Sequence, residues 1–530
     1  MMRFGLALFA AAGLALGVAG EVRAATPANT FVMAKNIDDI VSLDPAEGFE
    51  LSGIEIMANV YDRVMRYDAE DIKKLEGGAV QSWDVSADGK TFTFKLRPNL
   101  KFSTGDAMTA EDIAFSLQRS VILNKAPAFI LQQLGWDDKN VKDLVKATDA
   151  NTVSLTIKED FGTTFVLNAL SANLASVVEK KVALEHEKNG DLGNEWLKTN
   201  SAGTGPYILK SWKANDSVVL EANPYYWKAA PKLPRVVVRH VAEAASQRLL
   251  LEKGDIDMAR NLTPDMIQAL AGNKDLTVSS FPKADTYYLG LNQSFEPLTK
   301  PKVREALRWL IDYQGMADTF LKGQFQVQEA FWPAGFPGAL TENPFKLDAA
   351  KAKQLLAEGG YPNGFEVSLD TPTSSPFPAM AQSIQSTMAQ AGVKVNIVSG
   401  EQKQVITKYR ARQHQIVILY WSPDYQDPHA NASTFARNPD KPGAEKASTL
   451  ASRNNWFMPD LTKEAEDAVR ERDPEKRMAM YIDLQKKLQK DSPIINMFQA
   501  IEQTVQRKNV TGYISGPNPD TVFFRLITKT

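Results

Sequence analysis

The chain has 530 residues, more than a single hydrophobic core usually holds, so two or three packed units are expected. Its 44% hydrophobic and 23% charged residues are ordinary for a soluble globular protein and argue against long disordered segments. The 61 basic and 63 acidic residues nearly cancel, which argues against nucleic acid or an anionic membrane as the main partner. The absence of cysteine excludes disulfides, zinc–thiolate sites and cysteine nucleophiles.

Residues 1–24 have the pattern of a secretory signal peptide. Arg3 precedes an uncharged run from Phe4 to Gly20 that is rich in leucine, alanine and glycine, and Ala24 stands at the cleavage position. A membrane anchor is the alternative, but the run is short for a membrane span and is weakened by alanine and glycine. We therefore predict export and cleavage after Ala24, which gives a mature protein free in the bacterial periplasm.

Local patterns predict the next elements along the chain. Residues 30–37 form a first strand. Ala87–Lys90 contains an Asp-Gly turn just before the alternating strand Thr91–Leu96, which is the pattern of a hairpin. Thr109 and Asp112 then have the spacing of a capping box, so a helix should begin there.

Motifs in this region and further along the chain are similar to the signature of a known family. They are Ser82-Trp83, Asp88-Gly89, Thr93–Arg97, Lys101-Phe102, Gly105, Thr109–Ile113 and Arg119, followed by Gly203–Tyr207, Asn223–Trp227, Gly254–Asp257 and Pro301–Asp312. Together they resemble the extracellular solute-binding protein family 5, the peptide- and nickel-type binding proteins that serve bacterial ABC importers. The resemblance covers essentially all of the mature chain.

The resemblance implies an α/β fold of the two-lobed periplasmic binding protein type (type II-like), with a subdomain inserted in the first lobe. Two chain crossings, near residues 287–293 and 493–499, would form the hinge. The implied units are lobe I (25–65, 199–289 and 497–530), the inserted subdomain (66–198) and lobe II (290–496).

A doubly wound second lobe also follows from its residues alone. Strand patterns at Phe365–Leu369, Val393–Ile397 and Ile416–Tyr420 alternate with helical patterns at 380–388 and 405–409. Strand-helix-strand units with short links predict parallel strands joined by right-handed crossovers.

The turn after the last of these strands is the strongest candidate for a binding site. Pro423 fixes its own φ and removes a backbone donor, so Trp421 and Asp424 should lie at the carboxyl end of the strand, where ligands bind in open α/β sheets. An aromatic wall beside a carboxylate, with a second acid at Asp427, suits a ligand with an apolar body and a cationic group. The alternative is a core strand followed by an Asp-Pro turn with no role in binding.

Aromatic residues in loops are further candidates for lining a ligand cavity. With Trp421, this set comprises Trp332, Tyr425 and Trp456. An aromatic residue beside proline also often packs as a lid on the protein's own surface, so both interpretations stay open.

The sequence contains no common catalytic motif. It lacks the G-x-S-x-G elbow, the H-E-x-x-H zinc motif and the P-loop. No two of its four histidines lie within four residues of each other, so a helix-borne metal pair is excluded. We predict no enzyme activity, no cofactor and no metal, and we interpret His429 as a solvated loop residue. Spacing alone singles out no pair of carboxylates for glycoside hydrolysis.

The resemblance implies a monomeric periplasmic receptor that captures a short peptide or peptide-like solute between its lobes and delivers it to an inner-membrane ABC permease complex. A receptor of the same family for an opine, an oligosaccharide or a nickel complex is the alternative, and a secreted hydrolase and a chaperone-like protein are competing classes. In the peptide-binding members, the aspartate at the place of Asp424 pairs with the free amino terminus of the peptide.

In dipeptide-binding members, an arginine that holds the peptide carboxylate falls at about Thr371, which marks this position as a ligand contact. Residues 370–376 contain no basic residue, so the carboxylate of a dipeptide would be unpaired there. We therefore predict that the chain is not a strict dipeptide binder. A basic residue of a neighbouring helix is the alternative clamp; the candidates are Lys403, Lys408, Arg410 and Arg412.

Overall fold

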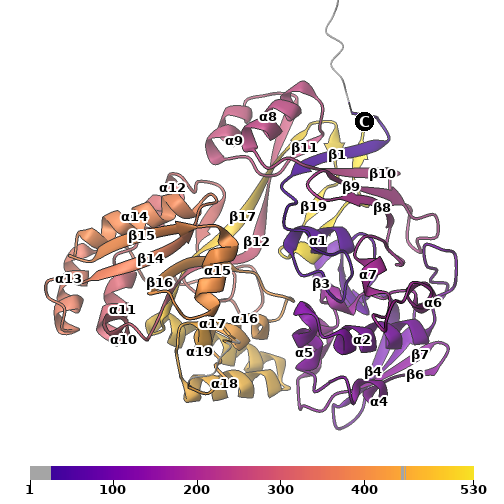
Figure 1. The fold of residues 1–530 in the computed structure, drawn as a ribbon, viewed down its shortest axis with the longest axis horizontal. Coiled ribbons are helices and arrows are strands. Elements are labelled where there is room, and N and C mark those ends of the chain that lie inside the picture. The colour runs from indigo at the N-terminus through magenta and orange to yellow at the C-terminus, as the bar shows by residue number, and fades with distance from the viewer. Residues whose placement is uncertain (1–25, 443–446, 448) are drawn as a thin grey trace, which may run out of the picture.

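The computed structural model describes residues 26–442, 447 and 449–530. The predicted signal peptide and its cleavage after Ala24 lie outside the described residues. The described chain folds into two lobes joined by two long strands, β12 (Leu276–Leu291) and β17 (Ile494–Arg507), as Figure 1 shows. None of the described helices is both long enough and apolar enough to cross a membrane.

One mixed sheet passes through both lobes. Within the described ranges it has eleven strands, with β13 (Phe325–Val327) paired to β17 at its side. The other strands are, in spatial order, β15 (Lys394–Gly400), β14 (Glu366–Pro372), β16 (Ile416–Trp421), β12, β17, β11 (Met258–Ala259), β1 (Thr30–Lys35), β10 (Arg235–His240), β9 (Ser217–Ala222) and β8 (Tyr207–Lys213). The second-lobe strands thus lie at one end, the first-lobe strands at the other, and β12 and β17 between them.

β12 and β17 pair in antiparallel fashion over most of their length. Their register shifts between Pro282 and Thr286 and again between Tyr287 and Tyr288, and such irregularities bend a strand pair locally. The predicted crossings, 287–293 and 493–499, lie at the second-lobe ends of these strands, and the two shifts lie just before and at the start of the first of them. The connection between the lobes is therefore a bent two-stranded ribbon within the sheet.

The second lobe has the parallel arrangement that its sequence predicts. β14 pairs in parallel with both β15 and β16, and the links carry α14 (Phe377–Ala389) and α15 (Gln402–Arg410). Apolar side chains of the strands and helices, among them Leu369, Ile384 and Ile418, are buried in one core. Parallel neighbours need such links, because the chain must return to the starting end of the sheet before the next strand.

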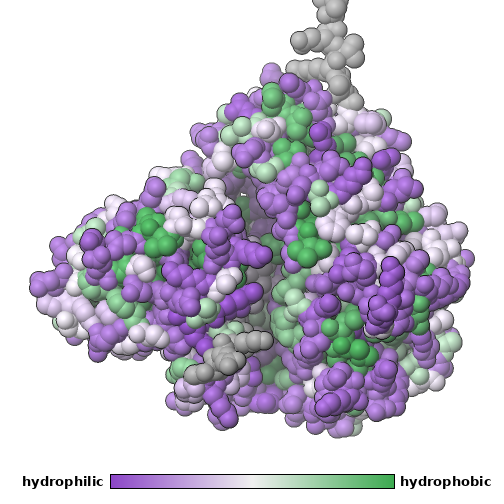
Figure 2. Space-filling model, viewed as in Figure 1, coloured by the Kyte–Doolittle hydropathy of each residue, from purple (hydrophilic) through white to green (hydrophobic). Residues whose placement is uncertain are grey.

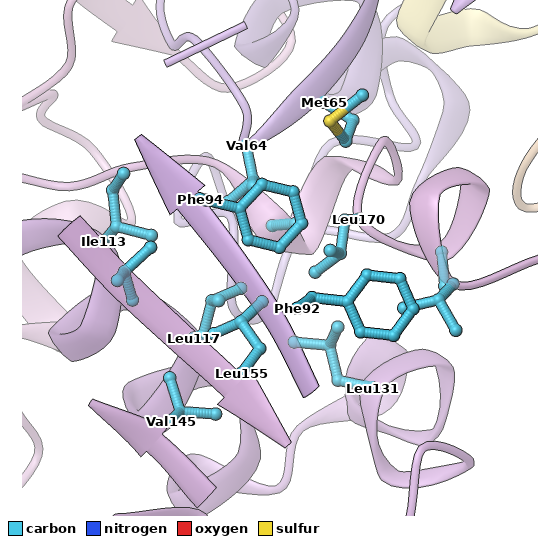
Figure 3. Packing of buried hydrophobic residues seen from close by; sticks show 14 of the residues in the cluster. Val64, Met65, Phe92, Phe94, Ile113, Leu117, Leu131, Val145, Leu155 and Leu170 are labelled. Carbon is cyan, nitrogen blue, oxygen red and sulfur yellow. The ribbon is translucent and has the colours of Figure 1, made fainter. Parts of the chain in front are cut away.

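A separate four-stranded sheet lies in the first lobe. Its order is β4 (Val80–Val85), β5 (Thr91–Leu96), β7 (Thr152–Thr156) and β6 (Val145–Asp149). Figure 3 shows Phe94 of β5 near Ile113 of α2 (Ala110–Leu123), in the core that this sheet and helix share. The predicted capping box is confirmed, because the backbone N–H of Thr109 donates to the Asp112 carboxylate at 2.8 Å.

The remaining elements surround these two sheets. The other strands are β2 (Met65–Asp68), β3 (Asp71–Gly77), β18 (Val510–Thr511), β19 (Ile514–Ser515), β20 (Val522–Phe523) and β21 (Thr528–Lys529). The other α-helices are α1 (Leu51–Met57), α3 (Phe129–Gln132), α4 (Val141–Leu144), α5 (Thr163–Ala169), α6 (Lys180–Glu185), α7 (Asn194–Leu197), α8 (Ala244–Lys253), α9 (Pro264–Leu270), α10 (Glu296–Thr299), α11 (Pro301–Arg308), α12 (Tyr313–Asp318), α13 (Ala349–Glu358), α16 (Pro428–Phe435), α17 (Leu450–Arg453), α18 (Pro459–Arg470) and α19 (Pro474–Lys490). Short 3₁₀ turns are η1 (Ala126–Ala128), η2 (Asn173–Ala175) and η3 (Pro519–Thr521).

Candidate ligand-binding site

A cavity of about 920 Å³ lies between the two lobes, where Figure 2 shows the molecule hollowed. Its volume lies in the range of small-molecule sites. Both lobes contribute to its lining. The first-lobe segments lie within residues 48–54, 126–133, 172–174 and 518–520, and the second-lobe segments within residues 402–410, 419–439 and 449–453.

The first-lobe side of the cavity carries an apolar wall. Phe49 and Phe129 meet edge to face with their ring centres 6.1 Å apart, and Ile130 and Leu174 continue the surface. Phe129 is 46% exposed, so much of its ring is not covered by the protein. An apolar surface left open inside a cavity favours an apolar group of a ligand.

Trp421 ends β16 and lines the second-lobe side of the cavity, at the strand end that its sequence pattern predicts. Its indole N–H donates to Oδ1 of Asn431 at 3.1 Å, and Nδ2 of Asn431 donates to the carbonyl of Phe331 at 2.6 Å. These bonds fix the orientation of the indole, so it presents a rigid aromatic surface to the cavity.

Asp424 lies just beyond the strand, half-buried in the cavity lining. Within the described part of the chain, its carboxylate has no hydrogen bond or ion pair. Burial raises the pKa of this carboxyl to about 7, and the negative charge of Asp520 adds to the shift. Asp520 also lines the cavity, but it is paired with Arg63. A desolvated carboxylate without a partner is stabilised by a cation, so Asp424 can accept a positively charged ligand group.

Tyr425 lines the cavity and also connects the lobes. Its ring packs edge to face on Phe165 of α5 with the ring centres 5.9 Å apart, and Nε2 of Gln133 donates to its hydroxyl at 3.4 Å. Only 3% of the residue is exposed. Its main contacts are therefore with the first lobe, and a small part of its surface remains for a ligand.

The carboxylate of Asp427, the second acid of the turn, is bound by other groups of the protein. Its carboxylate makes a bidentate, buried ion pair with Arg477 at 2.7 and 2.8 Å, and it caps α16 by accepting from the backbone N–H of His429 at 2.9 Å.

The interpretation of His429 as a solvated loop residue is wrong. Its ring is buried, Nδ1 lies 3.1 Å from the hydroxyl of Tyr481, and burial lowers the pKa of the imidazole to about 3. The reason is that Asp427 starts a helix that packs on α19.

Three other predicted site residues lie outside the cavity lining. Trp332 is fully buried and donates its indole N–H to the carbonyl of Pro337 at 3.0 Å. Trp456 packs against the core of the same lobe. Thr371 is fully buried at the end of β14, where its hydroxyl donates to the carbonyl of Pro372 at 3.3 Å. Both tryptophans thus pack within their own lobe, and Trp332 is buried in its core rather than packed as a lid on the protein's surface.

Three arginines of the second lobe, Arg410, Arg437 and Arg453, also line the cavity. The sequence raised Arg410 only as one of four possible replacements for a missing charge, and it gave no reason to select the other two. They come from three helical regions that only the fold brings together, so spacing along the chain carries no signal for them.

Comparison with known proteins agrees with this architecture. The family model for bacterial extracellular solute-binding proteins, family 5 (middle), matches residues 74–443. The probable D,D-dipeptide-binding periplasmic protein DdpA of Escherichia coli K12 is 30% identical over 508 residues, which cover 94% of each chain. The glutathione-binding protein GsiB of Pectobacterium atrosepticum is 28% identical over 520 residues and 96% of each chain.

Solved structures share the fold. The periplasmic binding protein DppA of Helicobacter pylori, in complex with the peptide STSA, superposes with a TM-score of 0.80 at 23% identity and covers 94% of this chain and 98% of its own. The murein tripeptide binding protein MppA of Escherichia coli gives a TM-score of 0.76 at 25% identity and covers 94% of this chain and 98% of its own. From the matched family model, the full-length relatives and this shared two-lobed fold, the chain belongs to family 5 of the bacterial extracellular solute-binding proteins.

Proposed function

We propose that the chain is the solute-binding protein of an ABC importer and that it captures short peptides or peptide-like solutes with a free amino group. The observation that carries the proposal is the Asp424 carboxylate, which faces a cavity between two lobes without a partner in the described residues. The names of relatives that bind D,D-dipeptides and glutathione support a peptide-like ligand.

In the proposed complex, the ammonium group of the ligand pairs with Asp424. A charge-assisted hydrogen bond in a desolvated site is among the stronger polar contacts, and it removes the cost of an unpaired carboxylate. The apolar part of the ligand lies between Trp421 and the wall of Phe49 and Phe129. Because these groups belong to different lobes, bound ligand favours the closed form of the protein.

The proposal includes a place of action and a partner. We propose a monomeric periplasmic protein, released by cleavage after Ala24, that presents its closed form to an inner-membrane ABC permease and catalyses no reaction. The periplasmic description of DdpA supports the location. We also propose that the lobes have the boundaries predicted from the sequence: 25–65, 199–289 and 497–530 for lobe I, 66–198 for the inserted subdomain, and 290–496 for lobe II.

Mass spectrometry of the solute that co-purifies with the protein tests the ligand class. The protein should be purified without added ligand and denatured gently, and the released small molecules should be identified. The expected result is a peptide or peptide derivative with a free amino group, present at up to one molecule per protein. A neutral oligosaccharide or a metal complex without an amine would contradict the proposal and would favour another solute class for the same fold.

A further inference from the structure

Basic side chains of the second lobe near the cavity fall into two groups. In the first group, the charge is compensated inside the protein: Lys408 pairs with Asp370 at 2.6 Å, and Arg437 pairs with Glu466 at 3.0 Å. These side chains therefore offer a ligand little uncompensated positive charge.

Arg410 and Arg453 form the second group. They are the last residues of α15 and α17, and both line the cavity. Neither guanidinium has an acidic partner in the described residues, and Nε of Arg453 is buried without a hydrogen-bond acceptor. The guanidinium carbon of Arg453 lies 5.6 Å from the centre of the Tyr409 ring, a cation–π contact that holds it in place.

Both arginines lie on the second-lobe side of the same cavity. Burial lowers the pKa of Arg410, and the positive charge of Arg453 lowers it further. Arg410 is exposed, so solvent screens its charge, whereas Nε of Arg453 is buried without an acceptor in the described residues. An anion in the cavity would supply the acceptor that Arg453 lacks. Guanidinium groups bind carboxylates through paired N–H donors, so a carboxylate is the anion that they fit in a peptide-like ligand.

We propose that Arg410 and Arg453 form a carboxylate-binding subsite, and that the solutes of this receptor are acidic, with a carboxylate at a distance from the amino group. The inference rests on the proposed function for the rest of the ligand, whose ammonium group occupies Asp424. Among the described residues, the cavity has an unpaired acid on one segment and two guanidiniums without acidic partners on two others, so it can bind a ligand that carries both an ammonium group and a carboxylate. Residues 370–376 contain no basic residue and therefore supply no clamp for a ligand carboxylate. The subsite of Arg410 and Arg453 would take the place of that clamp.

The test uses N-acetyl-L-glutamate, a probe that has carboxylates but no free amino group. Binding to the purified, ligand-free protein should be followed by calorimetry or ligand-observed NMR, with the neutral N-acetyl-L-glutamine amide as the matched probe. We expect N-acetyl-L-glutamate to bind saturably and the neutral amide not to bind. Arg410→Gln and Arg453→Gln should each weaken the binding of N-acetyl-L-glutamate about tenfold or more, because each removes one charged donor group. Lys403→Gln is the control variant, because Lys403 is exposed on the same helix and does not line the cavity.

A second arm separates this inference from the proposed function. A peptide that binds the wild type should lose affinity by about tenfold or more when its carboxylates are amidated, and the two arginine variants should not distinguish the acid from the amide. The inference is overturned if N-acetyl-L-glutamate fails to bind the wild type, if it binds the folded arginine variants equally well, or if amidation has no effect. Arginine-dependent binding of N-acetyl-L-glutamate by a protein that binds no peptide would instead overturn the peptide assignment and support the subsite.

Discussion

At the scale of single residues, the protonation of Asp424 should control how tightly a cationic ligand binds. Its pKa is raised to about 7, so the ligand-free protein carries a proton there in mildly acidic solution. A cationic ligand needs the ionised form, so its affinity should fall roughly tenfold for each pH unit below about 7 and level off above that value. Calorimetric titration of a binding peptide from about pH 5 to about pH 8 measures the profile. A constant wild-type affinity across that range would contradict this role of Asp424.

The raised pKa of Asp424 also predicts how the stability of the ligand-free protein changes with pH. A carboxyl whose pKa is higher in the folded than in the unfolded state stabilises the fold at low pH, and this contribution is lost as the pH rises through the folded pKa, here about 7. Ligand-free Asp424→Asn should therefore unfold at a higher temperature than the wild type at about pH 8, and the difference should shrink toward about pH 5. Differential scanning calorimetry at both values tests this, and an unchanged difference between them would show that Asp424 is not desolvated.

Asp427 has a structural role although it lies only three residues after Asp424. Asp427→Asn would leave the buried guanidinium of Arg477 without its bidentate partner, so unfolding should become easier by roughly 3–5 kcal/mol. Urea denaturation followed by circular dichroism measures this change. The control is Glu464→Gln, which breaks an ion pair with Lys487 on the surface and should change stability by about 1 kcal/mol or less. Equal effects of the two substitutions would refute the structural role.

At the scale of elements, the sequence predicted the strands, helix starts and turns that are determined by interactions between neighbouring residues. The alternation at 393–397 and the apolar run at 416–420 became β15 and β16, the strands on either side of β14, because both strand patterns are visible in the sequence. The capping box at Thr109 and the turn after Trp421 also needed only neighbouring residues. Trp421 and Asp424 were therefore found as cavity residues from the sequence.

The positions of other residues, within the site and behind it, depend on contacts between segments that are distant in the sequence. His429 is buried because α16 packs on α19, about fifty residues further along the chain, and no local pattern carries that information. Trp332 is buried in the core of its own lobe for the same kind of reason. Arg453 reaches the cavity only because α17 lies next to the end of α15, as its contact with Tyr409 shows.

Contacts between the lobes make a prediction for the segment that joins α18 to α19. Arg472 pairs with Asp160 at 2.5 Å and donates to the carbonyl of Asp88 at 2.8 Å, so a second-lobe side chain is held by the first lobe. Arg472→Ala should weaken ligand binding by a factor of up to about five, the range of an exposed ion pair, with little change in stability. Calorimetry of the variant and of the control Lys463→Ala, which breaks an exposed pair within α18, would check this. Stronger binding by Arg472→Ala would contradict a role in closure.

At the scale of the whole molecule, β12 and β17 connect the lobes through a ribbon with register shifts, and we expect the lobes to move as two bodies about this ribbon. A ligand that contacts both lobes should shift the population toward the closed form. Small-angle X-ray scattering should therefore give a smaller radius of gyration at saturating ligand than for ligand-free protein. An unchanged radius at saturation would refute closure of the cleft.

The proposed binding mode is that the receptor holds a peptide-like solute by its free amino group on Asp424, in the cavity between the lobes. The most direct measurement is calorimetric titration of one binding peptide, in its free form and with its amino terminus acetylated, into the wild type and into Asp424→Asn. Acetylation and Asp424→Asn should each cost roughly 2–5 kcal/mol of binding free energy in the folded protein, and the acetylated peptide should no longer distinguish the two proteins. Equal affinity of the wild type for the free and acetylated peptides would refute this binding mode.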